Sequence, residues 1–471
     1  MSFKPKTYAS LEIELEAEKL VNTLLSFERG RCVSLLDSGG ASGVGARFLV
    51  AGFDPFLTIQ STGPEVLIES PEGIEKFDGD ILKVIDEKVA AYGFPANKEF
   101  PFSLAGGCIT TLSYDLGLRF EPVLSPLYER RRYTEPDAFL AFYDTFIVHD
   151  YSHRKTFIVS CGGDRRVDEV YEMVRSPRSV LFEEEDMVQS FVTSNITRGK
   201  YEESVARIKE YISAGDIYQA NLTQELSCKL PSNLKPEKIF LRLRRQHPAP
   251  FGAFIQRGED TVISASPERF LRVSNTNKGR IIEAWPIKGT RPRGKTKRED
   301  ERLRKELLNS EKDHAENVMI VDLLRNDIGR VCEFGSVVVD ELCSLHEHPS
   351  LFHLVSKVRG LLCEGINLSD LLRATFPCGS ITGAPKIRAM EIIDEIESAP
   401  RGLSMGAIGY IGFDGSMDLN VAIRTMVIRD GVARFNVGGG IVADSVPSNE
   451  YDESLVKARA LLRALNAERW Q

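Results

Sequence analysis

Short apolar runs separated by glycine and proline fill about the first 180 residues and restrict what this part of the chain can form. Two such runs are Cys32–Leu36 and Ala138–Phe142, and turn residues stand at Gly39-Gly40 and Gly106-Gly107. Apolar runs of this length, bounded by turn residues, are typical of strands rather than of long helices. The sequence therefore predicts a strand-rich first part with a few helices between the strands.

The pattern changes after Thr197. Four apolar residues then recur at helical spacing, Tyr201, Val205, Ile208 and Ile212. We expect this helix to end at Gly215, because glycine is a frequent helix terminator. A strand is predicted over residues 217–226.

Further helices are predicted later in the chain. One long charged helical segment is expected over about residues 298–324, and another helix beginning near Pro385. The last 60 or so residues alternate strands with Gly438-Gly439-Gly440 and finish in a helix through Ala458 and Leu462. The whole chain is therefore predicted to be a mixed α/β (α+β) protein with much antiparallel strand.

A like-charge cluster, Glu183-Glu184-Glu185-Asp186, follows an irregular stretch. Such a cluster indicates a boundary or linker, and a solvated loop within one domain is the alternative. We divide the chain there into an N-terminal β-rich region, 1–190, and a second region, 191–471.

The composition excludes several classes of protein. The 471 residues are 42% hydrophobic and 27% charged, and 60 Lys+Arg against 68 Asp+Glu give a net charge of -8. We therefore expect no nucleic-acid partner. No apolar run approaches the roughly 18 residues of a membrane span, so no membrane association is expected. Charged residues follow the start where a secretion signal would be apolar, and the eight cysteines form no C-x-x-C pair. A cytoplasmic protein without zinc or disulfides is the expectation.

Lys288 occupies an unusual place, in the segment Pro286–Arg293. Proline restricts the backbone before it, and Gly289 allows close approach after it. A surface cation is one interpretation of this lysine. The other is a nucleophile whose neutral amine is favoured by burial and by the nearby Arg291 and Arg293.

Two acidic pairs share one spacing. Asp313 and Glu316, and Glu450 and Glu453, stand three residues apart in predicted helices, so each pair lies on one helical face. Carboxylates of this kind are the ligands that Mg²⁺ takes. Two solvated acidic helix faces are the alternative.

Three further segments have both a chemical and a structural interpretation. The turn Gly379–Lys386 would suit an anion before a helix, or would only cap that helix. The glycines 438–440 fit either a tight strand bend or a close approach to a ligand. Glu268, in Ser266–Phe270, is either a general acid whose proton is retained by burial, or a salt-bridge partner of Arg269 or Arg291.

These segments occur together, and with them the chain resembles the chorismate-utilising enzymes over nearly its whole length. The resemblance depends on six motifs, 215–222 (GDIYQANL), 266–270 (SPERF), 286–290 (PIKGT), 315–327 (AENVMIVDLLRND), 379–386 (GSITGAPK) and 438–445 (GGGIVADS). It implies a large sandwich of two antiparallel β-sheets flanked by helices, with Mg²⁺ holding the ring carboxylate of chorismate in a cleft.

The resemblance also implies roles for particular residues. The four acidic residues above would be metal and metal-water ligands. Substrate contacts would come from Gln219, Thr290, His353, Ser380, Arg424, Gly439, Gly440 and Lys457. Leu36 and Ser38 match the segment that binds tryptophan in relatives, as an inhibitor or as a structural ligand.

Two positions indicate the branch of the family. Lys288 matches the aminodeoxychorismate synthases, in which the lysine attacks C2 of chorismate and ammonia then adds at C4; anthranilate synthases resemble Pro-Ile-Ala-Gly-Thr here. Gln219 stands where isochorismate and salicylate synthases carry a lysine base, and an amide cannot activate water by taking its proton. Ser404 departs from the pattern, since relatives often have an aromatic residue there, which affects contacts with the enolpyruvyl side.

The expected function is therefore component I of an aminodeoxychorismate synthase, on the route to 4-aminobenzoate and folate. No glutaminase segment is visible, so a separate glutamine amidotransferase subunit is the expected ammonia donor, and the end at Gln471 leaves no room for a lyase. The alternatives are anthranilate synthase component I and a non-catalytic subunit that binds chorismate or tryptophan. Retention of Lys288, Glu268 and both acidic pairs argues against the last.

Overall fold

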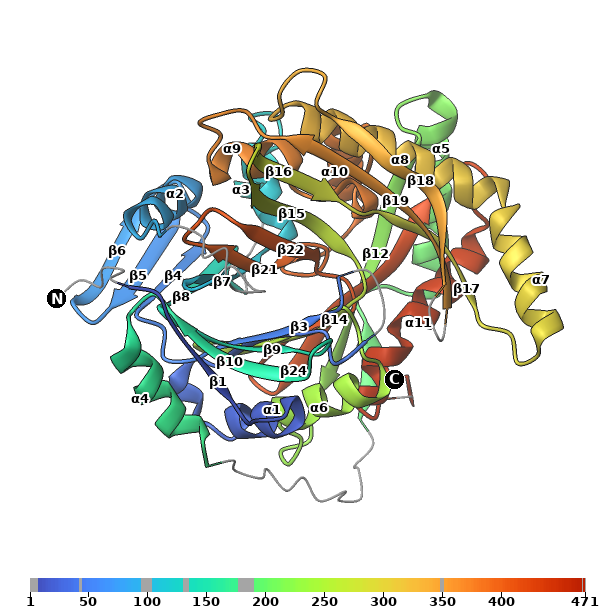
Figure 1. Ribbon diagram of the computed structural model, residues 1–471. Coiled ribbons are helices and arrows are strands. Elements are labelled where there is room, and N and C mark those ends of the chain that lie inside the picture. The colour runs from blue at the N-terminus through green and yellow to red at the C-terminus, as the bar shows by residue number, and fades with distance from the viewer. Residues whose placement is uncertain are drawn as a thin grey trace.

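Two large β-sheets face each other and helices cover their outer sides (Figure 1). The computed structural model describes residues 7–41, 45–94, 104–129, 135–176, 190–347, 351–467 and 469–470. Neighbouring strands pair antiparallel, apart from the short parallel pair of β11 and β25 among the described strands. The predicted sandwich of antiparallel sheets is confirmed.

The first sheet contains thirteen strands in the described residues, in the order β1-β10-β9-β3-β2-β13-β14-β23-β24-β12-β11-β25, with β20 also paired to β12. Their bounds are β1 Ala9–Ile13, β2 Ser34–Asp37, β3 Phe48–Gly52, β9 Thr145–Asp150, β10 Lys155–Ser160, β11 Phe191–Ser194, β12 Gln219–Lys229, β13 Phe251–Arg257, β14 Asp260–Ser266, β20 Gly383–Ala384, β23 Thr425–Arg429, β24 Val432–Ile441 and β25 Arg469–Trp470.

The second sheet contains twelve strands in the same part of the chain, in the order β17-β19-β16-β15-β22-β21-β7-β8-β4-β5-β6, with β18 paired to β19. Their bounds are β4 Leu57–Thr62, β5 Glu65–Ser70, β6 Gly73–Asp78, β7 Gly107–Leu112, β8 Ala138–Tyr143, β15 Arg269–Thr276, β16 Gly279–Ala284, β17 Ile287–Pro292, β18 Val338–Glu347, β19 Leu351–Leu361, β21 Ala407–Gly412 and β22 Met417–Val421.

The helices lie outside this pair of sheets (Figure 1). Helices α1, α4, α6 and α11 pack on the first sheet, α5 and α10 also contact β12, and α7 and α8 pack on β17 and β19. Their bounds are α1 Ala17–Leu25, α2 Ile81–Ala91, α3 Ser125–Glu129, α4 Asp164–Val174, α5 Arg198–Ala214, α6 Pro236–Gln246, α7 Lys297–Leu308, α8 Glu311–Gly329, α9 Leu368–Thr375, α10 Lys386–Ile396 and α11 Pro447–Ala464, with 3-10 turns η1 Arg29–Arg31, η2 Tyr114–Arg119 and η3 Gly379–Ile381. None of the helices in the described part of the chain combines the length and apolar character needed to cross a bilayer.

Apolar side chains fill the space between the sheets. Phe139 and Tyr143 of β8 in the second sheet pack there with Phe146 of β9 and Ile255 of β13 in the first. Every residue of β8 and of β9 is buried, which explains why these strands read as continuous apolar runs rather than as alternating ones. The strand-rich first part of the chain is confirmed.

The helix predicted from Tyr201 onward is confirmed as α5. The Thr197 hydroxyl accepts a hydrogen bond from the Lys200 N–H at its start, and Gly215 ends it in the left-handed conformation. The prediction of one continuous helical segment over 298–324 is wrong. It breaks at Asn309, because the Ser310 hydroxyl accepts from the Asp313 N–H and starts α8 as a new helix.

The two predicted regions share both sheets. Strand β2 pairs with β13 in the first sheet, and β7 pairs with β21 in the second, so strands from either side of residue 190 form continuous layers. The acidic cluster Glu183-Glu184-Glu185-Asp186 lies outside the described residues, and the division at 190 stays a prediction.

A buried arginine ties the layers together near their middle. The Arg401 guanidinium, in a residue 2% exposed, pairs with Glu397 and donates to the carbonyls of Asn221 at 2.6 Å and Ile381 at 3.0 Å. It also lies over the ring of Tyr114, 4.4 Å from its centroid. Arg401 thus joins β12 of one sheet to the turn η3 and to the segment that follows β7 of the other.

Candidate active site

A cavity of about 670 Å³ brings together most of the residues singled out in the sequence. Its walls come from β12, β17, β19 and β24, the turn η3, and the helices α8 and α11. It is lined by Glu268, Lys288, Thr290, Asp313, Glu316, His353, Ser380, Arg424, Gly440, Glu450, Glu453 and Lys457 among others. Gln219 and Gly439 are not among its lining residues, and Leu36 and Ser38 line another cavity.

Lys288 reaches this cavity through an irregularity in β17. It pairs with Leu354 of β19, while Thr290 pairs with the next residue along, His353, so Gly289 is an extra residue with no partner. Gly289 takes φ +77°, which favours glycine. Lys288 and Thr290 both line the cavity on either side of this bulge. The Lys288 Nζ donates to the Ser380 carbonyl at 3.3 Å.

Glu268 is 8% exposed and accepts a hydrogen bond from the Ser380 hydroxyl at 2.9 Å. Burial raises the pKa of its carboxyl, and Lys288 and Ser380 offset part of that rise. The alternative interpretation, that Glu268 forms a salt bridge with Arg269 or Arg291, is wrong. Arg269 pairs with Asp418, and Arg291 pairs with Glu306 and Asp313.

The arginines that follow Lys288 do not act as free cations beside it. Arg291 is held by the two carboxylates just named. Arg293 pairs with Asp300 at 2.6 Å and lies over the ring of Phe352. Because both guanidiniums are paired with carboxylates, they repel the Lys288 ammonium only weakly.

All four predicted metal ligands line the cavity, but they do not form a closed cage. Asp313 pairs with Arg291 at 3.1 Å, and Glu453 with Lys457 at 2.9 Å. Glu450 accepts from the Ser445 hydroxyl at 2.7 Å, and Glu316 lies 3.9 Å from Lys312. Within the described ranges, no three His, Cys, Asp or Glu side chains are close enough to hold a metal by themselves.

Glu316 and Glu450 are the two carboxylates least neutralised by cations. Burial raises the pKa of Glu316; Lys288 and Lys312 lower it, while Asp313 and Glu453 add like-charge repulsion. A divalent cation would relieve that repulsion. Mg²⁺ is commonly held by one or two protein carboxylates together with water and substrate oxygens, so this donor set fits it.

Arg424 offers an unpaired positive charge to a ligand. Its side chain is accessible within the cavity, burial lowers its pKa, and its guanidinium has no hydrogen-bond or ion-pair partner in the described part of the chain. An arginine in this state suits a carboxylate. Lys457 donates to the Gly438 carbonyl at 3.1 Å.

The glycines 438–440 form no tight bend, and that interpretation is wrong. They continue β24 as extended backbone beside β12. A Cβ on Gly439 would lie 3.2 Å from the Lys457 Nζ and 3.5 Å from Glu450 Oε2, so this glycine gives the charged groups room. A Cβ on Gly440 would meet the Gln219 amide at 2.2 Å.

The remaining predicted contacts are placed as follows. Gln219 is fully buried behind Gly440, and neither atom of its amide group has a partner in the described residues. The Thr290 hydroxyl and His353 Nδ1 are 2.9 Å apart on neighbouring strands. The turn before α10 contributes Ser380 and Ile381 from η3, whereas α10 itself begins only at Lys386.

Sequence reasoning gave no role to several residues that line the cavity. They include Asn221 of β12, Lys312 of α8, Met405 and Asn436 of β24. Asn221 stands in a quoted motif and could have been found there. Asn436 carries no local signal, because it reaches the site only through the pairing of β24 with β12.

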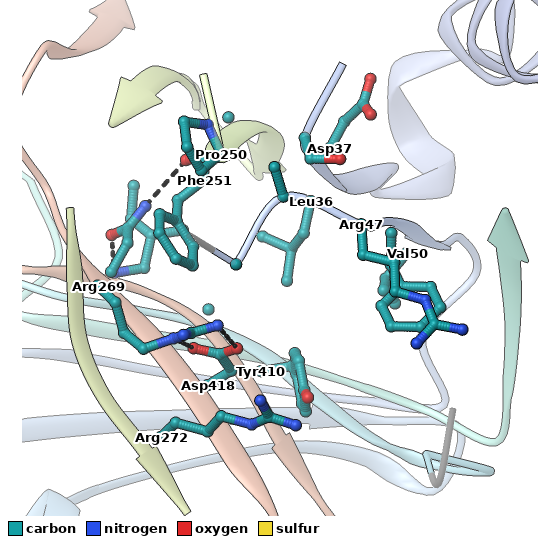
Figure 2. A pocket seen from close by; sticks show the side chains of 18 residues that line it. Leu36, Asp37, Arg47, Val50, Pro250, Phe251, Arg269, Arg272, Tyr410 and Asp418 are labelled. Carbon is teal, nitrogen blue, oxygen red and sulfur yellow. Dashed lines mark hydrogen bonds and ion pairs between the residues drawn. The ribbon is translucent and has the colours of Figure 1, made fainter. Parts of the chain in front are cut away.

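A second cavity of about 380 Å³ contains Leu36 and Ser38, the residues predicted to bind tryptophan. Figure 2 shows the Arg269 guanidinium held against the Asp418 carboxylate at one side of it, at 2.8 and 2.9 Å. Tyr410 and Arg272 lie close to this pair. Tryptophan binding there stays a prediction.

Comparisons with known proteins agree with this site. A family model described as "chorismate binding enzyme" matches residues 36–463. "Aminodeoxychorismate synthase component 1" of Escherichia coli is 38% identical over 92% of this chain and 92% of its own length. "Anthranilate synthase component 1" of Acetivibrio thermocellus is 36% identical over 97% of this chain and 94% of its own length. The crystal structure of anthranilate synthase component I from Streptococcus pneumoniae superposes with a TM-score of 0.77 and 31% identity, over 89% of this chain and 93% of that one.

Fold, cavity and comparisons together define a chorismate-utilising enzyme. The chain belongs to the chorismate-binding enzyme family, since the family model spans most of its length. Relatives with two different names stand at similar identity, so the choice between their reactions depends on the residues of the cavity.

We predict that Gly289→Ala displaces Lys288. A side chain in the left-handed conformation costs roughly 1–2 kcal/mol, and its Cβ would also lie 2.9 Å from the Asp313 Cβ. Turnover should fall, and urea unfolding should show the loss of stability. Gly365→Ala is the control, with φ +81° and no atom within 4 Å of its Cβ. Equal activity in the two variants would contradict this account of the bulge.

Proposed function

We propose that this protein is component I of an aminodeoxychorismate synthase, which converts chorismate and ammonia to 4-amino-4-deoxychorismate. The observation that carries the proposal is the position of Lys288, whose amine borders the cavity beside the buried Glu268. Anthranilate synthase component I is the alternative, because relatives of that name are equally similar.

Lys288 supplies the nucleophile in this proposal. Its neutral amine forms a C–N bond at C2 of chorismate, the ring double bonds shift, and the C4–O bond breaks. Glu268 gives its proton to the departing hydroxyl, which leaves as water. Ammonia then bonds to C4, the double bonds shift back, and the C2–N bond breaks to return the lysine.

Burial suits Glu268 to this task. A general acid must hold its proton near neutral pH, and the pKa of this carboxyl is raised by burial. Lys288 offsets part of the rise only while it is charged. Once Lys288 is neutral the offset disappears, so the acid is protonated when the amine is ready to attack.

The other groups would position the substrate. Mg²⁺ held by Glu316 and Glu450 would neutralise the ring carboxylate. Arg424 would bind the enolpyruvyl carboxylate, with the extended glycine backbone of β24 allowing close approach. The ammonia donor would be a separate glutamine amidotransferase subunit, and the relatives' names, which call each "component 1", fit such an arrangement.

The test of the function is product analysis with chorismate, Mg²⁺ and an ammonium salt. We expect 4-amino-4-deoxychorismate, recognised by its conversion to 4-aminobenzoate on addition of a lyase. With chorismate alone, intact-mass analysis should show an adduct on Lys288. Anthranilate as the main product would overturn the proposal.

Lys288→Ala should abolish the formation of aminodeoxychorismate, because no nucleophile then attacks C2. The cavity keeps its other groups, so ammonia can add at C2 itself and give anthranilate. Lys357→Ala on β19, which removes a lysine paired with Glu283 outside the cavity, is the control. Wild-type rates of aminodeoxychorismate formation in Lys288→Ala would exclude covalent catalysis.

Glu268→Gln should lower turnover by about 10²–10⁴-fold, the range for general acid catalysis. The amide can still accept the hydrogen bond from Ser380 but supplies no proton. Because a raised pKa keeps the acid protonated to higher pH, wild-type turnover should fall as the pH rises through it. Measured pH profiles should lose this alkaline limb in the variant. A folded variant with a smaller loss and an unchanged profile would remove Glu268 from this role.

Glu316→Gln and Glu450→Gln should each weaken Mg²⁺ binding by about tenfold, equivalent to 1.4 kcal/mol. Each change removes a negative charge at constant size. Calorimetric titration of Mg²⁺ in the presence of chorismate measures the effect without relying on activity. Glu311→Gln, on the exposed side of α8, is the matched control. Unchanged binding in both variants would defeat the assignment.

A further inference from the structure

A third cavity lies directly behind the substrate cavity. It has a volume of about 250 Å³ and is bordered by the loop before β21 and by β12 and β24. Asn436 lines both cavities. Ser404 lines the third cavity and the next residue, Met405, lines the substrate cavity. The wall between them is therefore one or two residues thick.

A row of polar side chains runs along β12 from one cavity to the other. Glu225, Thr223 and Asn221 alternate along the strand and so share one face. Their partners on β24 are Asn436, Gly438 and Gly440. Glu225 lines the third cavity and Asn221 lines the substrate cavity. Four residues of strand separate them, which corresponds to about 13 Å along β12. We call Glu225, Thr223, Asn221 and Asn436 the polar row.

Hydrogen bonds hold the middle of the polar row in place. The Asn436 amide donates to the Thr223 hydroxyl at 3.2 Å, and the Asn436 backbone N–H donates to Ser404 Oγ at 3.1 Å. Thr223 donates its own proton to Glu397, the partner of Arg401. One lone pair of the Thr223 hydroxyl and the hydroxyl proton of Ser404 are not used in these bonds, and both groups lie where the two cavities meet.

The inner end of the row carries buried acceptors that lack a partner. Asn221 is 7% exposed, and its Oδ1 accepts no hydrogen bond in the described part of the chain. Gln219, next on the same face, has an Oε1 that accepts no hydrogen bond and an Nε2 that donates none in the described residues. Burying such atoms unpaired costs about 1–3 kcal/mol each, so a small donor is expected to occupy this place.

The outer end of the row is acidic. Asp115, Glu135 and Asp137 line the third cavity together with Glu225. Burial raises the pKa of Glu225, and Arg434 beside it counteracts the rise. Of the arginines there, Arg429 is paired with Glu259, and Arg401 with Glu397. Glu135 is paired with the buried Arg257. The other carboxylates at this end of the row favour a cation, and acceptors further in favour a donor that carries several N–H groups.

We propose that the polar row is the route by which ammonia reaches the substrate: ammonium is bound at Glu225 and gives one proton to that carboxylate, and ammonia passes Thr223 and Asn436 to the amides of Asn221 and Gln219. This inference rests on the proposed function in so far as ammonia is the second substrate. Ammonium offers four N–H donors and no acceptor, which matches a carboxylate followed by hydroxyl and amide oxygens.

The test varies ammonium chloride at saturating chorismate and Mg²⁺ and at constant ionic strength. Thr223→Val keeps the size of the side chain and removes the hydroxyl. It should raise the KM for ammonium about fivefold, the effect of one lost hydrogen bond. Glu225→Gln should raise the same KM, and the rise should shrink as salt is added, because screening weakens the attraction. The KM for chorismate should not change in either variant.

Thr58→Val is the matched control, since Thr58 also lies on a strand and donates to a carboxylate, Glu69, but outside all three cavities. Adduct formation with chorismate in the absence of ammonia reports whether the substrate cavity is intact in each variant. An unchanged KM for ammonium in both variants would overturn the proposal. So would a parallel rise in the KM for chorismate. If the wild type makes anthranilate without an adduct, the proposed function fails, and the ammonium dependence of the variants still tests the route.

Discussion

The active cavity depends on one buried cation, the guanidinium of Arg401. It is saturated by Glu397 and by two backbone carbonyls, and a ring covers its face. Removal of either partner of such a pair typically costs about 3–5 kcal/mol, because a charge is left buried and uncompensated. Lysine could not replace this arginine, because only the planar guanidinium has N–H groups placed to donate to β12 and to η3 at the same time. Through η3 the same contact fixes Ser380, and through Ser380 it fixes both Glu268 and Lys288.

The groups proposed to react meet where the chain crosses between layers. Strand β14 ends at Ser266 in the first sheet, and β15 begins at Arg269 in the second, so Glu268 lies in the crossing itself. Lys288 comes from the second sheet and the glycine backbone from the first. In the proposed function, the two sheets thus supply the acid, the nucleophile and the anion-binding surface from different directions.

Local sequence signals predict the elements whose formation is determined locally. Helix α5 followed from apolar spacing, a threonine cap and Gly215. The break between α7 and α8 was missed, although the Ser310 cap that causes it is also local. The motifs placed Lys288, Glu268 and the acidic residues correctly in one cavity. What they could not give were partners set by strand pairing: the carboxylates that neutralise Arg291 and Arg293, or the contact of Thr223 with Asn436, more than 200 residues away.

Three successive glycines in β24 bear on how this surface can change in evolution. A methyl group at 438 would lie 1.9 Å from a backbone oxygen, at 439 it would crowd an ammonium and a carboxylate, and at 440 it would strike an amide. Gly438 is closed by backbone and Gly440 by the Gln219 amide, so no single compensating change elsewhere would reopen the whole segment to side chains. New substrate preferences must therefore arise where side chains rather than backbone form the cavity wall, at residues such as Met405.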